Sequence, residues 1–110
     1  MAPKIMKKLN KVLVDKVLVS VAEVKEVAVE EVVKGRIDLG GDDQRDVIIG
    51  GAQYFNPNDI VGKIVIVLAN LEPKTMAGVE SNAMLLAADV DDKPYWLTVT
   101  EDVALGSHIK

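Results

Sequence analysis

The sequence predicts an all-β domain, a small closed barrel of short strands with one short helix. The chain of 110 residues contains eighteen Val and eight Ile, and β-branched side chains favour strands because their restricted χ1 suits a pleated surface. Short apolar runs alternate with clusters of Gly, Asn, Asp and Pro, at which strands usually end. This length is typical of one domain, which we expect to extend over residues 1–110.

The first two strands are predicted over about residues 12–27 and 29–39. In the first, apolar residues alternate as far as Val21 and then fall out of phase, which is typical of a long bent strand with a bulge. The second ends at the Gly-Gly-Asp-Asp sequence of residues 40–43, whose composition is that of a hairpin turn. The Glu and Lys content of residues 12–33 also fits a helix, an alternative that the high Val density disfavours.

A third strand over residues 44–49 is followed by the one clear helix start of the sequence. Asn56 can cap a helix, and Pro57 suits the first helical position because its missing N–H is not needed there. Gly62 then closes the helix within about one turn. The continuous apolar run of residues 64–68 predicts a strand that is buried on both faces.

The last third of the sequence predicts two more strands. A loop over residues 72–82 leads to an apolar run at residues 84–88, and a turn at residues 91–94 precedes a strand over residues 95–99. The complete pattern is about six short strands with one helical turn between the third and the fourth. It predicts the oligonucleotide/oligosaccharide-binding fold (OB-fold), a five-stranded Greek-key barrel with a short helix at one end, here with terminal extensions.

The composition excludes several classes of function. The chain has no Cys and one His, His108, which excludes disulfides, Cys-based zinc sites and most catalysis by Cys or His. No phosphate-binding glycine loop or nucleophile elbow is present, and the Asp residues of 89–92 lack the Gly and Glu of a calcium loop. We therefore expect no enzyme activity, metal or cofactor in this chain. With no long apolar run and no secretory signal, we expect a cytoplasmic protein that does not contact membranes.

Charge is distributed unevenly along the chain. Residues 1–16 contain five Lys and one Asp, a net charge of +4, whereas residues 17–110 contain eight basic and sixteen acidic residues, a net charge of -8. RNA affinity depends on basic side chains that release counterions from phosphates. We expect the barrel to bind RNA weakly unless its positive groups gather on one face.

Several motifs between residues 45 and 88 resemble one family. They include Arg-Asp-Val-Ile at 45–48, Asn-Leu-Glu-Pro-Lys at 70–74, Gly-Val-Glu-Ser at 78–81 and Met-Leu-Leu-Ala-Ala at 84–88. This stretch resembles the tRNA-binding domain appended to methionyl-tRNA synthetases, which also occurs as small free-standing dimeric proteins. The resemblance continues more weakly to Lys110 and is loose before residue 38.

The resemblance implies a non-catalytic module that binds the outer corner of tRNA by shape and assists methionyl-tRNA synthetase. It also implies a homodimer that uses segments outside the barrel, so we expect residues 1–12 and 95–110 at the dimer interface. A synthetase catalytic domain is a further expected partner. Ser81 is expected to hydrogen-bond the RNA, Met84 to offer an apolar contact and Arg45 to bind a phosphate. The complete set of implied RNA-binding residues is Arg45, Asn70, Lys74, Ser81, Asn82 and Met84.

Departures from the family pattern leave a second function open. The first strand lacks the family's Arg and Gly, since residues 15–19 read Asp-Lys-Val-Leu-Val, and Glu30 and Glu31 occupy the region of a phosphate-facing Lys on the second strand. The alternative is a member of the family with weakened RNA binding that serves as a dimerisation or protein-binding, chaperone-like element. Binding of labelled tRNA would distinguish the two functions.

Overall fold

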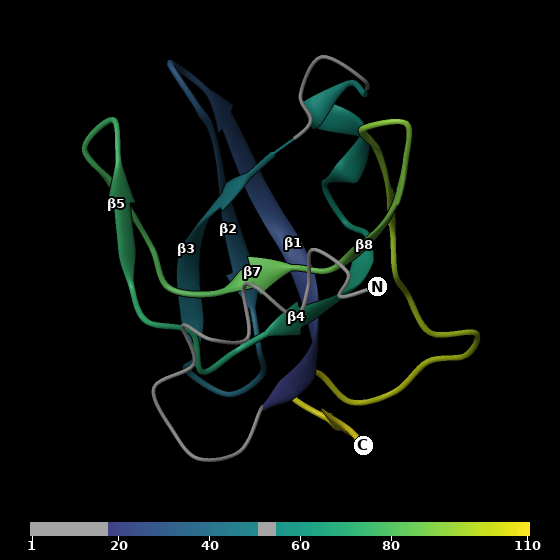
Figure 1. Cartoon of the computed structure of the whole chain (residues 1–110). Helices are drawn as coiled ribbons and strands as arrows, with labels where there is room; N and C mark the ends of the chain where they lie inside the picture. Colours follow the sequence, from purple (N-terminus) through teal and green to yellow (C-terminus); the bar gives the residue numbers. More distant parts are fainter. Residues whose placement is uncertain (1–17, 51–54) are drawn as a thin grey trace.

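The computed structural model describes residues 18–50 and 55–110, and the described residues form a strongly twisted β-barrel (Figure 1). In this part of the chain the main sheet is antiparallel and has the strand order β3-β2-β1-β4-β7. Its strands are β1 (Val19–Val29), β2 (Val33–Asp38), β3 (Gln44–Ile49), β4 (Ile64–Leu68) and β7 (Met84–Leu85). The fourth strand returns beside the first, which is the Greek-key order, so the predicted OB-fold is confirmed.

The long first strand bends at a bulge, as the sequence predicts. Its beginning pairs with β4, from Val19 opposite Leu68 onward, and its end pairs with β2 as far as Val29 opposite Val33. Between Val24 and Glu26 the register with β2 shifts, and a bulge of this kind lets one strand serve two sides of a barrel. The helical alternative is therefore wrong for residues 18–33, whereas residues 12–17 of the predicted strand lie outside the described residues.

The barrel closes where β3 meets the segment that leads into β7. The backbone N–H of Asn82 donates to the carbonyl oxygen of Asp46 at 3.0 Å, and the N–H of Ile48 donates to Ser81 Oγ at 3.0 Å. We call this line of contacts the seam. These bonds satisfy backbone groups that an open sheet edge would leave unpaired.

The core consists of two clusters on either side of β4. The side chains of Val65 and Val67 belong to one cluster, and those of Ile66 and Leu68 belong to the other. The prediction that this strand is buried on both faces is thereby confirmed. The 3₁₀ helix η2 (Pro57–Ile60) inserts Ile60 into the first cluster and closes that end of the barrel.

The cap of η2 is the predicted one. Asn56 Oδ1 accepts a hydrogen bond from the N–H of Asn58 at 3.1 Å, and Pro57 occupies the first helical position. Gly62 follows with a φ of 86°, a left-handed conformation that ends the helix without steric cost because glycine has no Cβ.

Several predicted boundaries are wrong. The second strand begins at Val33, so Glu30 and Glu31 lie in the turn after β1 and not on a strand. The predicted loop at residues 72–82 contains a hairpin of β5 (Lys74–Met76) and β6 (Val79–Ser81), a separate two-stranded sheet beside β3 (Figure 1). Ala77 and Gly78 in its turn both have positive φ. Alanine is not a typical residue for such a turn position, so the sequence does not indicate the hairpin.

The last predicted strand is also displaced. The run at residues 84–88 is divided between β7 and β8 (Ala87–Val90), and β8 pairs with β9 (Lys93–Trp96). The turn between them is limited to two residues, Asp91 and Asp92, both with positive φ, as hairpins with two-residue loops require. A final short strand, β10 (His108–Ile109), pairs with the start of β1. No described helix is long and apolar enough to cross a membrane.

Candidate nucleic-acid interface

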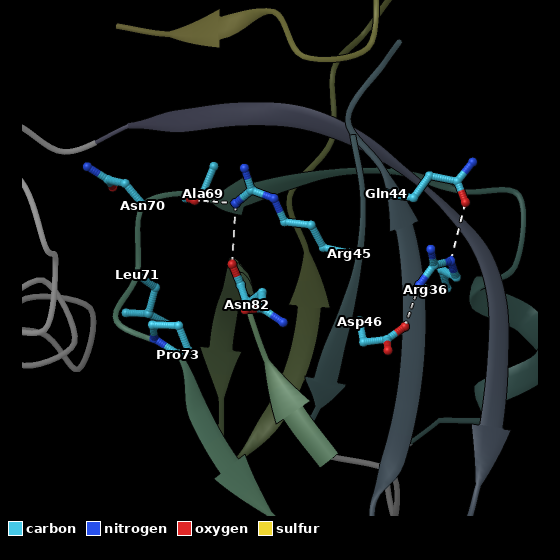
Figure 2. Close-up of a pocket in the computed structure, with 9 residues that line it drawn as sticks. All are labelled: Arg36, Gln44, Arg45, Asp46, Ala69, Asn70, Leu71, Pro73 and Asn82. Atoms are coloured by element: carbon cyan, nitrogen blue, oxygen red, sulfur yellow. Dashed lines mark hydrogen bonds and ion pairs between the residues drawn. The ribbon is translucent and has the colours of Figure 1, made fainter. Parts of the chain in front are cut away.

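An open groove of about 430 Å³ lies between the start of β3 and the segment that leaves β4 (Figure 2). Polar side chains and short apolar side chains share its walls. Both arginines of the chain are among the lining residues, which are Arg36, Gln44, Arg45, Asp46, Ala69, Asn70, Leu71, Pro73 and Asn82.

Arg45 joins three separate segments at one side of this groove. Its Nε and Nη2 donate to the two carboxylate oxygens of Asp43, at 2.9 and 3.1 Å. Its Nη1 donates to the backbone oxygens of Ala69 and Asn82. These bonds use four of the five N–H donors of a guanidinium. Arg45 therefore holds the end of β4 and the approach to β7 against β3, with 26% of its side chain exposed.

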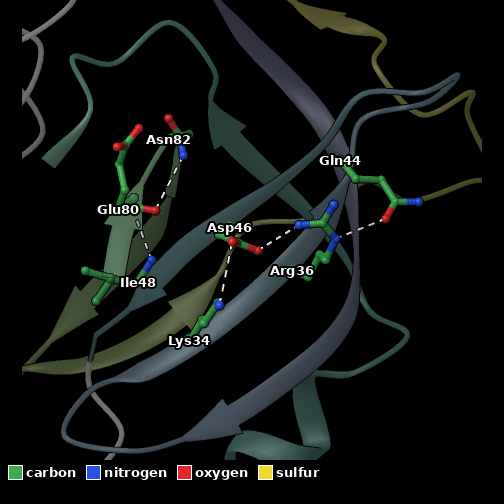
Figure 3. A network of polar contacts seen from close by, with 8 residues as sticks. Lys34, Arg36, Gln44, Asp46, Ile48, Glu80 and Asn82 are labelled. Atoms are coloured by element: carbon green, nitrogen blue, oxygen red, sulfur yellow. Dashed lines mark hydrogen bonds and ion pairs between the residues drawn. The ribbon is translucent and has the colours of Figure 1, made fainter. Parts of the chain in front are cut away.

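A second group of charges covers the outer face of β2 and β3 (Figure 3). Residues along β2 alternate between buried and half-exposed, so Lys34 and Arg36 project on the same side. Arg36 Nη1 lies 2.8 Å from Asp46 Oδ1, and Lys34 Nζ lies 3.6 Å from Asp46 Oδ2. Arg36 Nε also donates to Gln44 Oε1 at 3.3 Å. One carboxylate thus holds two cations beside the groove.

Ser81 and Asn82 belong to the seam. Ser81 is 8% exposed, and its hydroxyl accepts from the N–H of Ile48 and donates to the carbonyl of Ala83, both at 3.0 Å. Its only hydrogen is therefore already donated inside the protein. The backbone of Asn82 is fixed by Asp46 and Arg45, whereas its amide side chain lines the groove and donates to the carbonyl oxygen of Glu80 at 3.4 Å.

The remaining predicted residues lie around the groove in different settings. Asn70 lines it, and its Oδ1 accepts from the N–H of Leu18 at 2.9 Å, which anchors the start of β1. Lys74 is exposed at the first position of β5, opposite Ser81 in the hairpin. Met84 is half-buried against the second core cluster.

The structure thus brings Arg45, Asn70 and Asn82 together in one groove. Ser81 lies behind the groove within the seam, and Lys74 stands on the hairpin that leads to it. The sequence reasoning missed Lys34 and Arg36. The sequence could have indicated them, because Lys34 and Arg36 are two residues apart on a predicted strand, and this spacing places both charges on one face.

Comparison with known proteins gives the family. Residues 17–108 match the model of the family described as "Putative tRNA binding domain". The chain belongs to this family. The methionine--tRNA ligase of Archaeoglobus fulgidus is 41% identical over 80 residues, which cover 73% of this chain and 12% of that protein. The chain spans about a tenth of the length of the curated relatives it matches.

Two solved structures have the same fold as this chain. The methionyl-tRNA-synthetase-related protein of Pyrococcus horikoshii is 27% identical, with a TM-score of 0.78 over 100% of this chain and 99% of that chain. The chaperone CsaA of Bacillus anthracis has a TM-score of 0.78 over the whole of both chains at 17% identity, so that similarity concerns the fold alone.

Proposed function

We propose that this chain is a non-catalytic tRNA-binding module that holds the ribose–phosphate backbone of the tRNA outer corner in the groove between β3 and the end of β4. The observation that carries the proposal is the gathering of Lys34, Arg36 and Arg45 on neighbouring strands beside two amide side chains, Asn70 and Asn82. A barrel that is acidic overall thus gathers three of its cations in one region, where they can contact neighbouring phosphates.

The chemistry of the groove suits a backbone ligand. Arginine and lysine bind phosphate oxygens, and amides can both donate to phosphate and accept from a 2′-hydroxyl. Of the three described aromatic side chains, Phe55 and Trp96 stack edge-to-face with ring centroids 5.5 Å apart and pack against the core. Tyr95 is 49% exposed on β9, but Lys93 Nζ lies over its ring, so it is a single exposed aromatic side chain. Base stacking on aromatic platforms is therefore not the proposed mode. Recognition by shape and charge fits a folded RNA better than a single strand.

The residues have different roles in this proposal. Lys34 and Arg36 supply charge to phosphates, and Arg45 fixes the groove wall while its fifth N–H remains for a ligand. Ser81 has a structural role in the seam and does not contact RNA in this proposal, because its hydroxyl is buried and its hydrogen is donated to Ala83. Lys74 on the hairpin adds a charge beyond the groove, and the half-buried side chain of Met84 offers an apolar contact.

We further propose that the module acts in the cytoplasm beside methionyl-tRNA synthetase, as a homodimer. Its curated relatives are methionine--tRNA ligases, in which the matched region is a small part of the protein. A tethered second contact of this kind increases the hold of a synthetase on tRNA through effective concentration, without a new catalytic group.

The test is titration of labelled tRNA with the purified chain at about 50 mM and 200 mM salt. We expect binding at low salt that Lys34→Gln weakens several-fold. Lys93→Gln is the matched control, because it removes the same charge from β9, where Lys93 lies over the ring of Tyr95. If the two variants weakened tRNA binding equally, this would contradict the proposal that the groove is the RNA-binding site.

A second candidate function is a dimerisation or protein-binding element with weak RNA binding. Two carboxylates, Asp43 and Asp46, stand among the cations of the groove and offset part of their charge. Absence of tRNA binding even at low salt, together with a stable dimer by light scattering, would favour this candidate.

A further inference from the structure

The carboxylate of Asp46 lies between Lys34 and Arg36, two of the cations to which the proposed function assigns phosphate binding. Asp46 lines the groove, lies directly opposite Arg36 in the β2–β3 register, and contacts a different cation with each carboxylate oxygen. Its backbone carbonyl is held by Asn82 at the seam. The carboxylate is therefore fixed in place among the cations that would bind RNA.

The charges of this region nearly cancel. Lys34, Arg36 and Arg45 contribute three positive charges, and Asp43 and Asp46 contribute two negative charges, which leaves a net charge of +1. All of these side chains are partly exposed; Lys34 and Arg36 are 40% and 43% exposed. A phosphate can reach them, but it has to replace an existing ionic partner.

We propose that Asp46 is an internal competitor for RNA phosphate, a built-in counter-charge that limits the affinity of the groove and reduces its salt dependence. This inference rests on the proposed function. When a phosphate binds, Lys34 and Arg36 exchange one anionic partner for another, so fewer new charge contacts form per phosphate bound. The release of counterions, which drives binding to nucleic acids, is reduced accordingly.

Asp46 is better suited to this role than Asp43. Asp43 forms a bidentate ion pair with Arg45. Arg45 also donates to the backbone oxygens of Ala69 and Asn82, so a change at Asp43 would disturb the barrel seam. The carboxylate of Asp46 contacts the side chains of Lys34 and Arg36, both on the outer face of β2. Its neutralisation should therefore change binding with little change in the fold.

The experiment compares Asp46→Asn with Asp102→Asn, which removes the same charge from an exposed position between β9 and β10. Exposed ion pairs are individually weak, so we expect Asp46→Asn to bind labelled tRNA about three- to tenfold more tightly than the wild type. Asp102→Asn should change the affinity by less than about twofold. The slope of log affinity against log salt should become steeper by about 0.7–0.9, because one negative charge is removed from the region.

A third variant identifies the cations involved. In a Lys34→Gln/Arg36→Gln background, Asp46→Asn should give no larger gain than Asp102→Asn, since the cations that it would free are absent. Thermal melting of each variant shows whether the fold is retained.

The outcomes distinguish this inference from the proposed function. If the wild type binds tRNA and Asp46→Asn binds no more tightly than Asp102→Asn, the competitor role is overturned and tRNA binding stands. If no variant binds tRNA, the proposed function fails, and elution from a heparin column then decides the role of Asp46. Later elution of Asp46→Asn than of Asp102→Asn supports the counter-charge, whereas elution at the same salt concentration overturns it.

Discussion

Replacement of Ser81 by alanine distinguishes a structural serine from one that contacts RNA. The change removes a hydroxyl that satisfies the N–H of Ile48 and the carbonyl of Ala83. Ala83 is fully buried and Ser81 is 8% exposed, so water cannot easily replace either bond. A buried polar group that loses its partner costs about 1–3 kcal/mol.

Because two groups lose a partner and Ile48 is only half-buried, we expect the free energy of unfolding to fall by about 2–4 kcal/mol. For a domain of this size the melting temperature should fall by about 8–15 °C. Urea unfolding followed by the fluorescence of Trp96, the single tryptophan, is a direct assay because this side chain packs against the core.

The matched control is Ser107→Ala. The hydroxyl of Ser107 also donates to a backbone carbonyl, that of Ala104 at 2.6 Å, but at an exposed site, so its loss should change stability by less than about 0.5 kcal/mol. At a temperature where both variants are folded, tRNA affinity should differ from the wild type by less than about twofold. A normal stability for Ser81→Ala combined with a large loss of tRNA affinity would refute the structural role and indicate direct contact.

Three further predictions concern the core, the C-terminal segment and the salt dependence of binding. Val67→Ala should destabilise the protein by about 2–3 kcal/mol in urea unfolding, because Val67 is fully buried, while Val90→Ala at a 52% exposed position should have little effect. Gly106→Ala should lower the melting temperature by several degrees, since Gly106 has a φ of 84° and a Cβ there would meet the backbone oxygen of Leu39; an unchanged melting curve would contradict the described packing of this segment. If three cations contact phosphates, the tRNA affinity should fall by at most about 20- to 40-fold between 50 and 200 mM salt, because the exchange of partners at Asp46 reduces counterion release, and a flat salt response would contradict phosphate binding.

The main strands could be predicted because local signals and tertiary packing agree there. The apolar run of β4 and the capped start of η2 each match the final structure. The β5–β6 hairpin was missed because Ala77, an ordinary strand or helix residue, occupies a left-handed turn position. Pro94 was assigned to a turn but lies in β9, where a proline is tolerated on an edge strand.

The site was only partly predictable, since it depends on which side chains fold toward one another. Asn70 and Asn82 were identified from sequence motifs, and the structure places both in the groove. The roles of Arg36 and Asp46 depend on a cross-strand pairing between β2 and β3, which the sequence alone does not specify. The burial of Ser81 likewise depends on barrel closure, a contact between segments 33 residues apart.

The central claim is that RNA lies in the groove that both arginines line, and the chain offers a direct test because it has two arginines, Arg36 and Arg45. A ¹⁵N NMR spectrum of the arginine side chains should therefore contain two Nε–H signals, one for each wall of the groove. On titration with tRNA at low salt, we predict a shift of the Arg36 signal, because this side chain must leave Asp46 to reach a phosphate. Two signals that stay in place while backbone amides of β8 and β9 shift would contradict the account.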